Sequence, residues 1–211
     1  MKLSIIILLL LGSFVHNLSA QTKEEEGRFT ASIVAGVNIS QIDGDDAWGY
    51  RKVGFNGGAR GGILFGERME LCTEILFSQK GSVATPNSSR SGNAYTVHMD
   101  YIEVPVLFYY KDWQATDAKN RNYMRVMIGG GFSYSQLLNL GIQNSSGLQN
   151  NSFSKSDFMF MLDANFFLHR NWGINVRWAR SLASIYNDNP AGNRPDYVIN
   201  RSIIIRLVFK F

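Results

Sequence analysis

The stretch Tyr197–Phe211 reads YVINRSIIIRLVFKF, and from Ile203 onward every second residue is large and apolar. Successive side chains of a β-strand point to opposite faces of a sheet, so this spacing predicts a strand with one continuous apolar face. That face consists of Ile203, Ile205, Leu207, Phe209 and Phe211. The opposite face consists of Ser202, Ile204, Arg206, Val208 and Lys210. An exposed apolar edge strand invites pairing with other chains in water, so we expect this strand to close a barrel whose apolar face meets lipid.

Seven further segments show the same alternation and are predicted to be strands. They are Phe29–Ser40, Val53–Phe65, Met69–Lys80, Val97–Lys111, Asn122–Leu138, Asp157–Leu168 and Trp172–Leu182. Each is long enough to cross a bilayer at a tilt, for which about 9–11 residues suffice. The predicted fold class is therefore all-β, an eight-stranded antiparallel up-and-down transmembrane β-barrel.

The connections between these strands alternate in length. Long polar loops are predicted at Gln41–Lys52, Gly81–Thr96, Asn139–Ser156 and Ala183–Asp196. Tight turns are predicted at Gly66–Arg68 and His169–Asn171, while the connection Asp112–Arg121 interrupts the contrast. Long external loops opposite short periplasmic turns are typical of outer-membrane barrels.

The N-terminal segment has the pattern of a secretory signal peptide. Lys2 precedes the apolar run Leu3–Val15, and Ser19-Ala20 offers small residues at a cleavage site. The apolar run is too short for a membrane-spanning helix. We therefore expect a cleaved signal peptide at 1–20, a short polar lead at 21–28, and the barrel at 29–211, with export to the cell outer membrane.

The polar face of the predicted strands carries small residues and a balanced set of charges. Bulky aromatic side chains on the other face would overfill an eight-stranded interior, which favours lipid outside and charges inside over a soluble, ligand-holding barrel of the lipocalin type. Buried charges need partners, so five basic and five acidic residues are expected to form a structural charge network in the lumen. They are Arg60, Glu70, Glu74, Glu103, Arg125, Asp157, Asp163, Arg177, Arg206 and Lys210.

Composition argues against several other classes of function. The formal net charge of +4 is spread along the chain, so no nucleic-acid partner is expected. The single cysteine, Cys72, lies within a strand pattern and is expected to be a small buried residue. The acidic run Asp43–Asp46 lacks the ligand spacing of a calcium loop. The glycine pairs Gly57-Gly58 and Gly61-Gly62 are not followed by the Lys-Ser/Thr that ends a phosphate-binding loop. We expect no cofactor and no metal.

One pair of residues is a candidate for catalysis. His98 and Asp100 lie two positions apart near the expected outer rim, on the same strand face. Small barrels that modify lipids or cleave proteins use a histidine with a serine or acids at this rim. The alternative is an interfacial histidine beside a rim carboxylate, and we expect this structural role rather than an enzyme.

The segment Tyr101–Phe108, together with Ala35–Ser40, Glu74–Gly81 and Arg177–Leu182, resembles the outer-membrane β-barrel domain family common in Bacteroidetes, often labelled porin-family or PorT-like. The resemblance implies an eight-stranded barrel in a Gram-negative outer membrane. It also implies that the last strand, through Leu207, Phe209 and Phe211, is the signal recognised by the barrel-assembly machinery. The PorT name further suggests a link to a protein-secretion apparatus.

The function expected is that of a structural or interaction barrel with a largely plugged lumen. Its partners would be outer-membrane lipid, the assembly machinery during biogenesis, and a protein partner at the outer loops. Trp48, Tyr50, Tyr95 and Tyr186 in those loops are candidates for partner contacts or for membrane-interface anchors. Three alternatives stay open: a component of a secretion apparatus, a small diffusion pore, and an outer-leaflet lipid-modifying enzyme.

Overall fold

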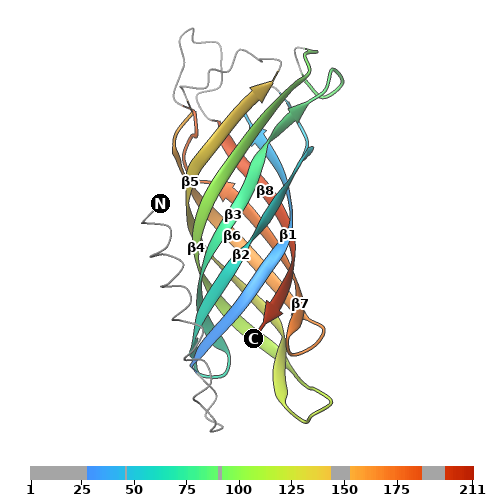
Figure 1. Cartoon of the computed structure of the whole chain (residues 1–211), viewed down its shortest axis with the longest axis vertical. Helices are drawn as coiled ribbons and strands as arrows, with labels where there is room; N and C mark the ends of the chain where they lie inside the picture. Colours follow the sequence, from blue (N-terminus) through green and yellow to red (C-terminus); the bar gives the residue numbers. More distant parts are fainter. Residues whose placement is uncertain (1–27, 46, 90–91, 144–152, 187–197) are drawn as a thin grey trace, which may run out of the picture.

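The computed structural model describes residues 28–45, 47–89, 92–143, 153–186 and 198–211 (Figure 1). The predicted signal peptide and nearly all of the predicted polar lead lie outside these residues. In the described part of the chain, no helix is long and apolar enough to cross a membrane.

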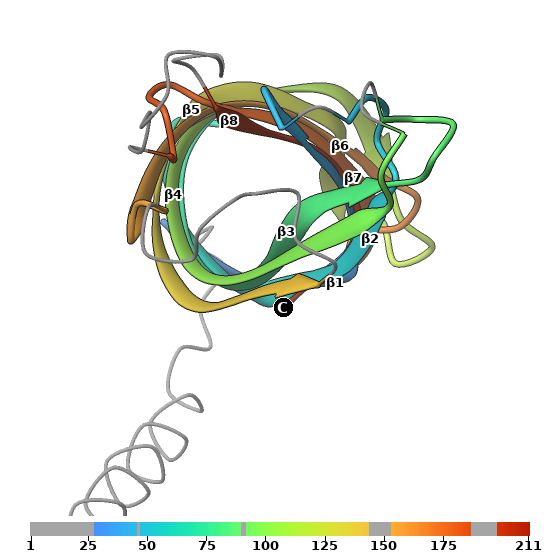
Figure 2. The same ribbon diagram turned by 90° about the horizontal axis from the view of Figure 1, so that it is seen from above.

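Eight antiparallel strands form one closed barrel, which confirms the predicted fold class. The strands are β1 Phe29–Asp43, β2 Lys52–Phe65, β3 Met69–Ala84, β4 Tyr95–Thr116, β5 Asn122–Gln143, β6 Ser156–Phe167, β7 Trp172–Ser181 and β8 Ile199–Lys210. Each strand pairs with the next along the chain, and β8 closes the ring by pairing with β1 from Ser32↔Lys210 to Asp43↔Ile199. Viewed along the barrel, the strands enclose a single lumen (Figure 2).

The connection predicted at Asp112–Arg121 exists, but its predicted start is wrong. β4 and β5 remain paired as far as Thr116↔Asn122, so the connection shrinks to residues 117–121. Asp117 organises this turn by accepting hydrogen bonds from the backbone N–H groups of Lys119, at 2.8 Å, and Arg121, at 3.0 Å. Polar side chains at the end of β4 suggested a loop, but pairing with the neighbouring strand decides the conformation.

With that correction the connections alternate without exception. Short turns at 66–68, 117–121 and 168–171 share one end of the barrel, which we call the short-turn end. The longer connections 44–51, 85–94, 144–155 and 182–198 share the other, the long-loop end, and parts of them lie outside the described residues. Several strands also run farther toward the long-loop end than predicted, since β3 reaches Ala84 and β5 reaches Gln143.

The outer surface is a belt of large apolar side chains, and the alternation predicted it strand by strand. Exposed members include Phe29, Ile33, Val37, Phe55, Ile63, Ile75, Val106, Phe108, Ile128, Phe132, Phe158, Leu162, Trp172, Val176, Ile205 and Leu207. Toward the long-loop end this surface becomes polar, where Arg201 on β8 forms an ion pair with Asp43 on β1 at 2.7 Å. The aromatic pair Trp172 and Phe209, with ring centroids 4.8 Å apart, lies toward the short-turn end.

The lumen is less polar than the sequence predicted. Two apolar clusters are buried inside the barrel in addition to the charges. One includes Val34, Leu76, Leu107, Met127, Met161 and Val208. The other, toward the long-loop end, includes Ile42, Tyr95, Val97, Met99 and Ile185. Cys72 is 1% exposed within the first cluster, as expected for a small buried residue.

Candidate functional site

The centre of the lumen is organised around one carboxylate, that of Glu74 on β3. Arg60 on β2 lies with its Nε 2.7 Å from Glu74 Oε1. Arg177 on β7 donates to both carboxylate oxygens, at 2.9 and 3.0 Å, and Arg206 on β8 lies 3.3 Å from Oε2. These side chains are at most 3% exposed, so Glu74 collects three guanidinium groups from three strands out of contact with water.

A second carboxylate, Asp163 on β6, completes the set. Its Oδ2 lies 2.6 Å from Arg177 Nε. Three buried asparagines accept further guanidinium hydrogens: Asn175 accepts from Arg206 at 2.6 and 2.8 Å, Asn165 accepts from Arg60 at 3.0 Å, and Asn56 accepts from Arg206 at 3.1 Å. Arg60 Nη2 has no hydrogen-bond partner among the described residues. We call this group the central cluster. Its members are Asn56, Arg60, Glu74, Asp163, Asn165, Asn175, Arg177 and Arg206.

The central cluster joins opposite walls of the barrel. Arg60 stands on β2 and reaches Asn165 on β6, while Arg177 on β7 reaches Glu74 on β3. Charge-assisted hydrogen bonds of this length are the stronger class, and buried ion pairs hold only when such bonds satisfy both partners. A layer of fixed, paired side chains therefore crosses the lumen near its middle.

Closer to the long-loop end lies a second buried pair that the sequence analysis found only in part. Glu103 on β4 was predicted to face the lumen, and its Oε2 lies 2.7 Å from Nζ of Lys80 on β3, with both side chains fully buried. Lys80 also lies 2.9 Å from Met159 Sδ and 5.1 Å from the Tyr101 ring. Asp157, whose charge also interacts with that of Lys80, accepts hydrogen bonds from Ser181 at 3.0 Å and from Asn200 at 2.9 Å.

Toward the short-turn end, Glu70 is a further buried acid. It accepts a hydrogen bond from Thr30 Oγ1 and lies 3.5 Å from Nζ of Lys111. Lys80 and Lys111 were missing from the predicted network because they fall at the ends of the predicted strands. Strand parity was the available signal, since Lys80 shares a face with Glu74 and Lys111 shares one with Glu103.

Arg125 was predicted to face the lumen, and this prediction is wrong. Its guanidinium carbon lies 5.6 Å from the ring centroid of Trp113. Trp113 is 57% exposed and packs on the outward-facing Phe166, so Arg125 lies at the outer surface. Met124, predicted to face outward, instead lines the lumen. The reason is local. Trp113 on β4 has φ 60°, a left-handed conformation that interrupts the inward–outward alternation of side chains on β4 and on the paired strand β5.

His98 and Asp100 do share the outer face of β4, near the long-loop end. His98 Nε2 lies 2.9 Å from Asp100 Oδ1. The same carboxylate accepts hydrogen bonds from Gln79 at 3.1 Å and from Asn139 at 3.2 Å. The pair is therefore part of a polar network that ties β3, β4 and β5 together at the edge of the apolar belt.

Two of the four loop aromatics do not face outward. Tyr95 is 2% exposed and donates its hydroxyl to the carbonyl oxygen of Asp45. Tyr186 is 8% exposed and packs edge-on against Phe153, with ring centroids 5.0 Å apart. Trp48 is 53% exposed, and Tyr50 is half-buried. The two tyrosines thus close the lumen at the long-loop end instead of presenting a binding surface.

The first long connection contains a buried acid. Asp45 is 4% exposed, and its Oδ1 accepts the backbone N–H of Ala47 at 3.0 Å. Burial, only partly offset by hydrogen bonds, raises the pKa of Asp45 to about 6. The acidic run Asp43–Asp46 therefore contributes one outward ion pair and one buried carboxyl, in keeping with a structural turn.

The three residues predicted as the assembly signal lie on the outer face of the closing strand or just beyond it. Leu207 is 58% exposed and Phe211 is 70% exposed. Phe209 packs between Trp172, at 4.8 Å, and Phe211, at 5.3 Å. The backbone N–H of Phe211 donates to Ala31 at 3.0 Å, so pairing with β1 continues to this residue.

Comparison with known proteins gives the family. The sequence profile of the outer membrane protein beta-barrel domain matches residues 19–187. No curated protein matches the chain. Among solved structures, the barrel is similar to Ail, the attachment invasion locus protein of Yersinia pestis, at 12% identity and a TM-score of 0.48, covering 88% of this chain and 100% of Ail.

Two other small barrels are similar at comparable levels. Outer membrane protein W of E. coli is 13% identical with a TM-score of 0.46, covering 90% of this chain and 100% of that protein. Neisserial surface protein A is 9% identical with a TM-score of 0.44, covering 88% and 98% of the two chains. The profile match spans most of the described barrel, and its description agrees with the closed ring of strands and the apolar outer belt. This chain belongs to the outer membrane protein beta-barrel domain family, whose members are proteins of the outer membrane.

Proposed function

We propose that this protein is a membrane-anchored interaction barrel that does not conduct solutes and works through its external loops. The observation that carries the proposal is the central cluster. Arg177 reaches across the lumen to Glu74, and Arg60 reaches across to Asn165, so a layer of buried, paired side chains bridges the lumen. An eight-stranded barrel has an interior just wide enough for its own side chains, which leaves no room for water beside such a layer.

The two apolar clusters add to this seal. Tyr95, Met99 and Ile185 are buried on the long-loop side, and Leu107, Met127 and Met161 are buried nearer the short-turn end. A diffusion pore would need a continuous wet path past all three layers. The small-pore alternative is therefore the weaker one.

A structural role for His98 and Asp100 is part of the proposal. Catalysis at a serine- or cysteine-dependent site requires a nucleophile within hydrogen-bonding reach of the base. Among the described residues, the Asp100 carboxylate that pairs with His98 also accepts hydrogen bonds from the side-chain amides of Gln79 and Asn139, and neither amide is a nucleophile. Such a network favours an interfacial anchor over an outer-leaflet enzyme.

The working surface in this proposal is the long-loop end. In this class of barrel the longer connections face the outside of the cell, and here they include the exposed Trp48. An exposed tryptophan on a rigid barrel is a typical anchor for a protein partner. Outer-membrane lipid around the apolar belt and the assembly machinery acting on β8 would be the other partners. The signal peptide, and the PorT-like link to secretion, remain predictions from the sequence.

Liposome swelling tests the proposal. The purified barrel would be reconstituted and challenged with small sugars and amino acids, beside a sixteen-stranded porin as positive control. The proposal predicts no swelling above that of protein-free liposomes. Swelling at a rate that scales with the amount of inserted barrel would replace the interaction barrel with a pore.

A further inference from the structure

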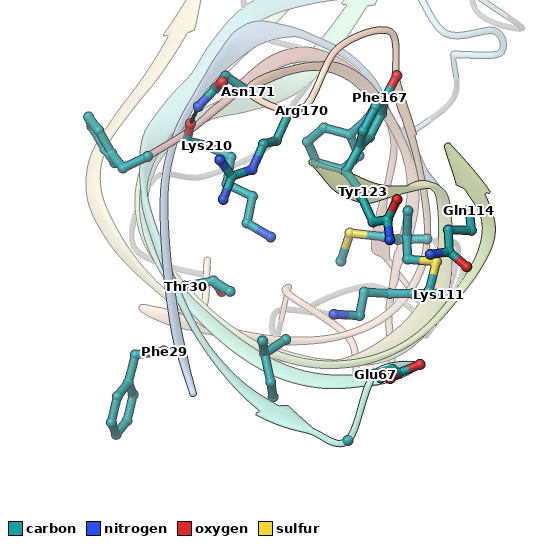
Figure 3. A pocket seen from close by; sticks show the side chains of 16 residues that line it. Phe29, Thr30, Glu67, Lys111, Gln114, Tyr123, Phe167, Arg170, Asn171 and Lys210 are labelled. Carbon is teal, nitrogen blue, oxygen red and sulfur yellow. Dashed lines mark hydrogen bonds between the residues drawn. The ribbon is translucent and has the colours of Figure 1, made fainter. Parts of the chain in front are cut away.

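The short-turn end of the lumen contains a cavity that the proposed function does not use. Its volume is about 410 Å³, within the range of small-molecule sites. Residues of β1, β2, β4, β5, β6 and β8 line it, together with the turns 66–68 and 168–171 (Figure 3). The central cluster lies beyond it in the barrel, so the cavity is closed on one side and open toward the short-turn end.

Three cations point into this cavity: Lys111, Arg170 and Lys210 (Figure 3). Lys111 forms an ion pair with Glu70, with its Nζ 3.5 Å from Glu70 Oε2. For Arg170 and Lys210, no ion pair is formed with any residue that the structure describes. The lining carries these three cationic side chains against one acidic side chain, that of Glu67. An excess of positive charge in a confined space attracts an anion, because low-dielectric walls strengthen the field inside.

The remaining wall is largely apolar. Tyr123 and Phe167 contribute aromatic side chains (Figure 3), and Met127 also lines the cavity. Met127 and Phe167 are each 4% exposed, so this surface is continuous with the apolar packing of the lumen. Methionine and aromatic side chains adapt to apolar ligands of varied shape. A bare inorganic ion would leave this wall unused.

We propose that the cavity is a binding site for a small organic anion, one with a phosphate or carboxylate head and an apolar body. Lys210 and Arg170 hold the head, and the body lies against Met127 and Phe167. The ligand enters from the short-turn end and leaves by the same route, because the central cluster blocks passage through the barrel. The site binds its ligand and does not transport it.

Calorimetry with benzyl phosphate tests the site, using the full barrel in phosphatidylcholine nanodiscs and empty nanodiscs as the blank. Benzyl phosphate should bind saturably. Inorganic phosphate lacks the apolar body and benzyl alcohol lacks the charge, so each should bind at least about tenfold more weakly. Raising the salt concentration should weaken the binding of benzyl phosphate, since its head is held by charge.

The matched variants are Lys210→Gln and Arg170→Gln, with Lys119→Gln as the control. Lys119 belongs to the short turn 117–121 at the same end of the barrel and does not line the cavity. Each cavity variant should weaken benzyl phosphate binding about tenfold, and the control should leave it unchanged. Arg170 lies in an exposed turn, so its variant keeps the test valid even if Lys210→Gln fails to fold. Absence of saturable binding to the wild type, or equal binding by the folded Arg170→Gln variant, would overturn the proposal.

Discussion

Arg177 on β7 forms two hydrogen bonds to Glu74 on β3, from Nη1 at 2.9 Å and from Nη2 at 3.0 Å, although 103 positions separate the residues in the sequence. A guanidinium and a carboxylate that meet through two parallel bonds form one of the strongest and most directional polar contacts in proteins. In this barrel the contact joins two walls of the lumen. It also fixes the carboxylate to which Arg60 and Arg206 bind.

Removing that carboxylate should destabilise the barrel strongly. Glu74→Ala leaves three arginines with Asp163 as the only acid of the central cluster, and an uncompensated buried charge typically costs about 3–5 kcal/mol. The measurement is the midpoint of urea unfolding in detergent, followed by heat modifiability on gels. Glu67→Ala, at an exposed position in the turn 66–68, is the control and should leave the midpoint unchanged. An unfolding midpoint for Glu74→Ala equal to that of the control would show that the cluster contributes little to stability.

Glu103 offers a test of which face of β4 is inside. Glu103→Ala strands the fully buried Lys80, so the expected loss is again about 3–5 kcal/mol. The neighbouring Val104 is 38% exposed toward lipid, and Val104→Ala removes only a small apolar area and should cost about 1 kcal/mol or less. The two variants would be compared by the temperature at which heat-modifiability gels show unfolding. If Val104→Ala were clearly the more damaging, the assignment of inner and outer faces would be reversed.

How far the sequence predicts this site can be judged from individual residues. Alternation alone placed Glu74, Arg177 and Arg206 on the inner face, because each lies mid-strand where parity is unbroken. It could not say that these three meet, since contacts across the lumen depend on the register and tilt of all the strands together. Arg125 was misplaced because one left-handed residue, Trp113, breaks the parity of the facing strand.

The errors in the predicted strand ends have a different cause from the misplacement of Arg125. The segment beginning at Asp112 has the composition of a loop, yet it extends β4 because β5 offers a partner up to Thr116↔Asn122. Lys80 was missed for a related reason, since the predicted strand ended at that residue and the true strand continues to Ala84. The position at which a strand ends depends on the neighbouring strand with which it pairs, and the sequence of one segment does not identify that neighbour.

The buried acid in the first long connection predicts a pH effect of defined sign. The pKa of Asp45 is raised by burial from 3.8 to about 6, so the folded protein binds this proton more tightly than the unfolded chain does. Its contribution to stability is fully present below about pH 4 and is lost as the pH rises through about 6. Asp45→Asn should therefore stabilise the protein at pH 7 relative to wild type by about 1–3 kcal/mol, and should change little at pH 4.

Urea unfolding of both proteins at pH 4, 5, 6 and 7 measures this difference. Taking the difference between variant and wild type removes the titration of the lumen carboxylates, which the two proteins share. Asparagine keeps an oxygen that accepts the backbone N–H of Ala47, so the turn is preserved. A difference that stays constant from pH 4 to pH 7 would contradict the raised pKa.

The orientation of the barrel predicts which cysteines a membrane-impermeant maleimide reaches on intact cells. Asn93→Cys places a thiol in the long connection 85–94, and Lys119→Cys places one in the short turn 117–121. The native Cys72 is 1% exposed and should not react. Labelling of Asn93→Cys but not of Lys119→Cys is expected, with both labelled after lysis. The reverse order on intact cells would place the short turns outside.

The central claim is that the Glu74-centred cluster seals the lumen, and single-channel recording in planar lipid bilayers tests it most directly. Ions probe the seal more stringently than sugars, because a single file of water suffices to carry them. Recordings at both voltage polarities from the purified wild-type barrel, with insertion verified independently, should show no steady conductance above that of the bare bilayer. Long-lived, uniform current steps whose number follows the number of inserted barrels would contradict the sealed lumen.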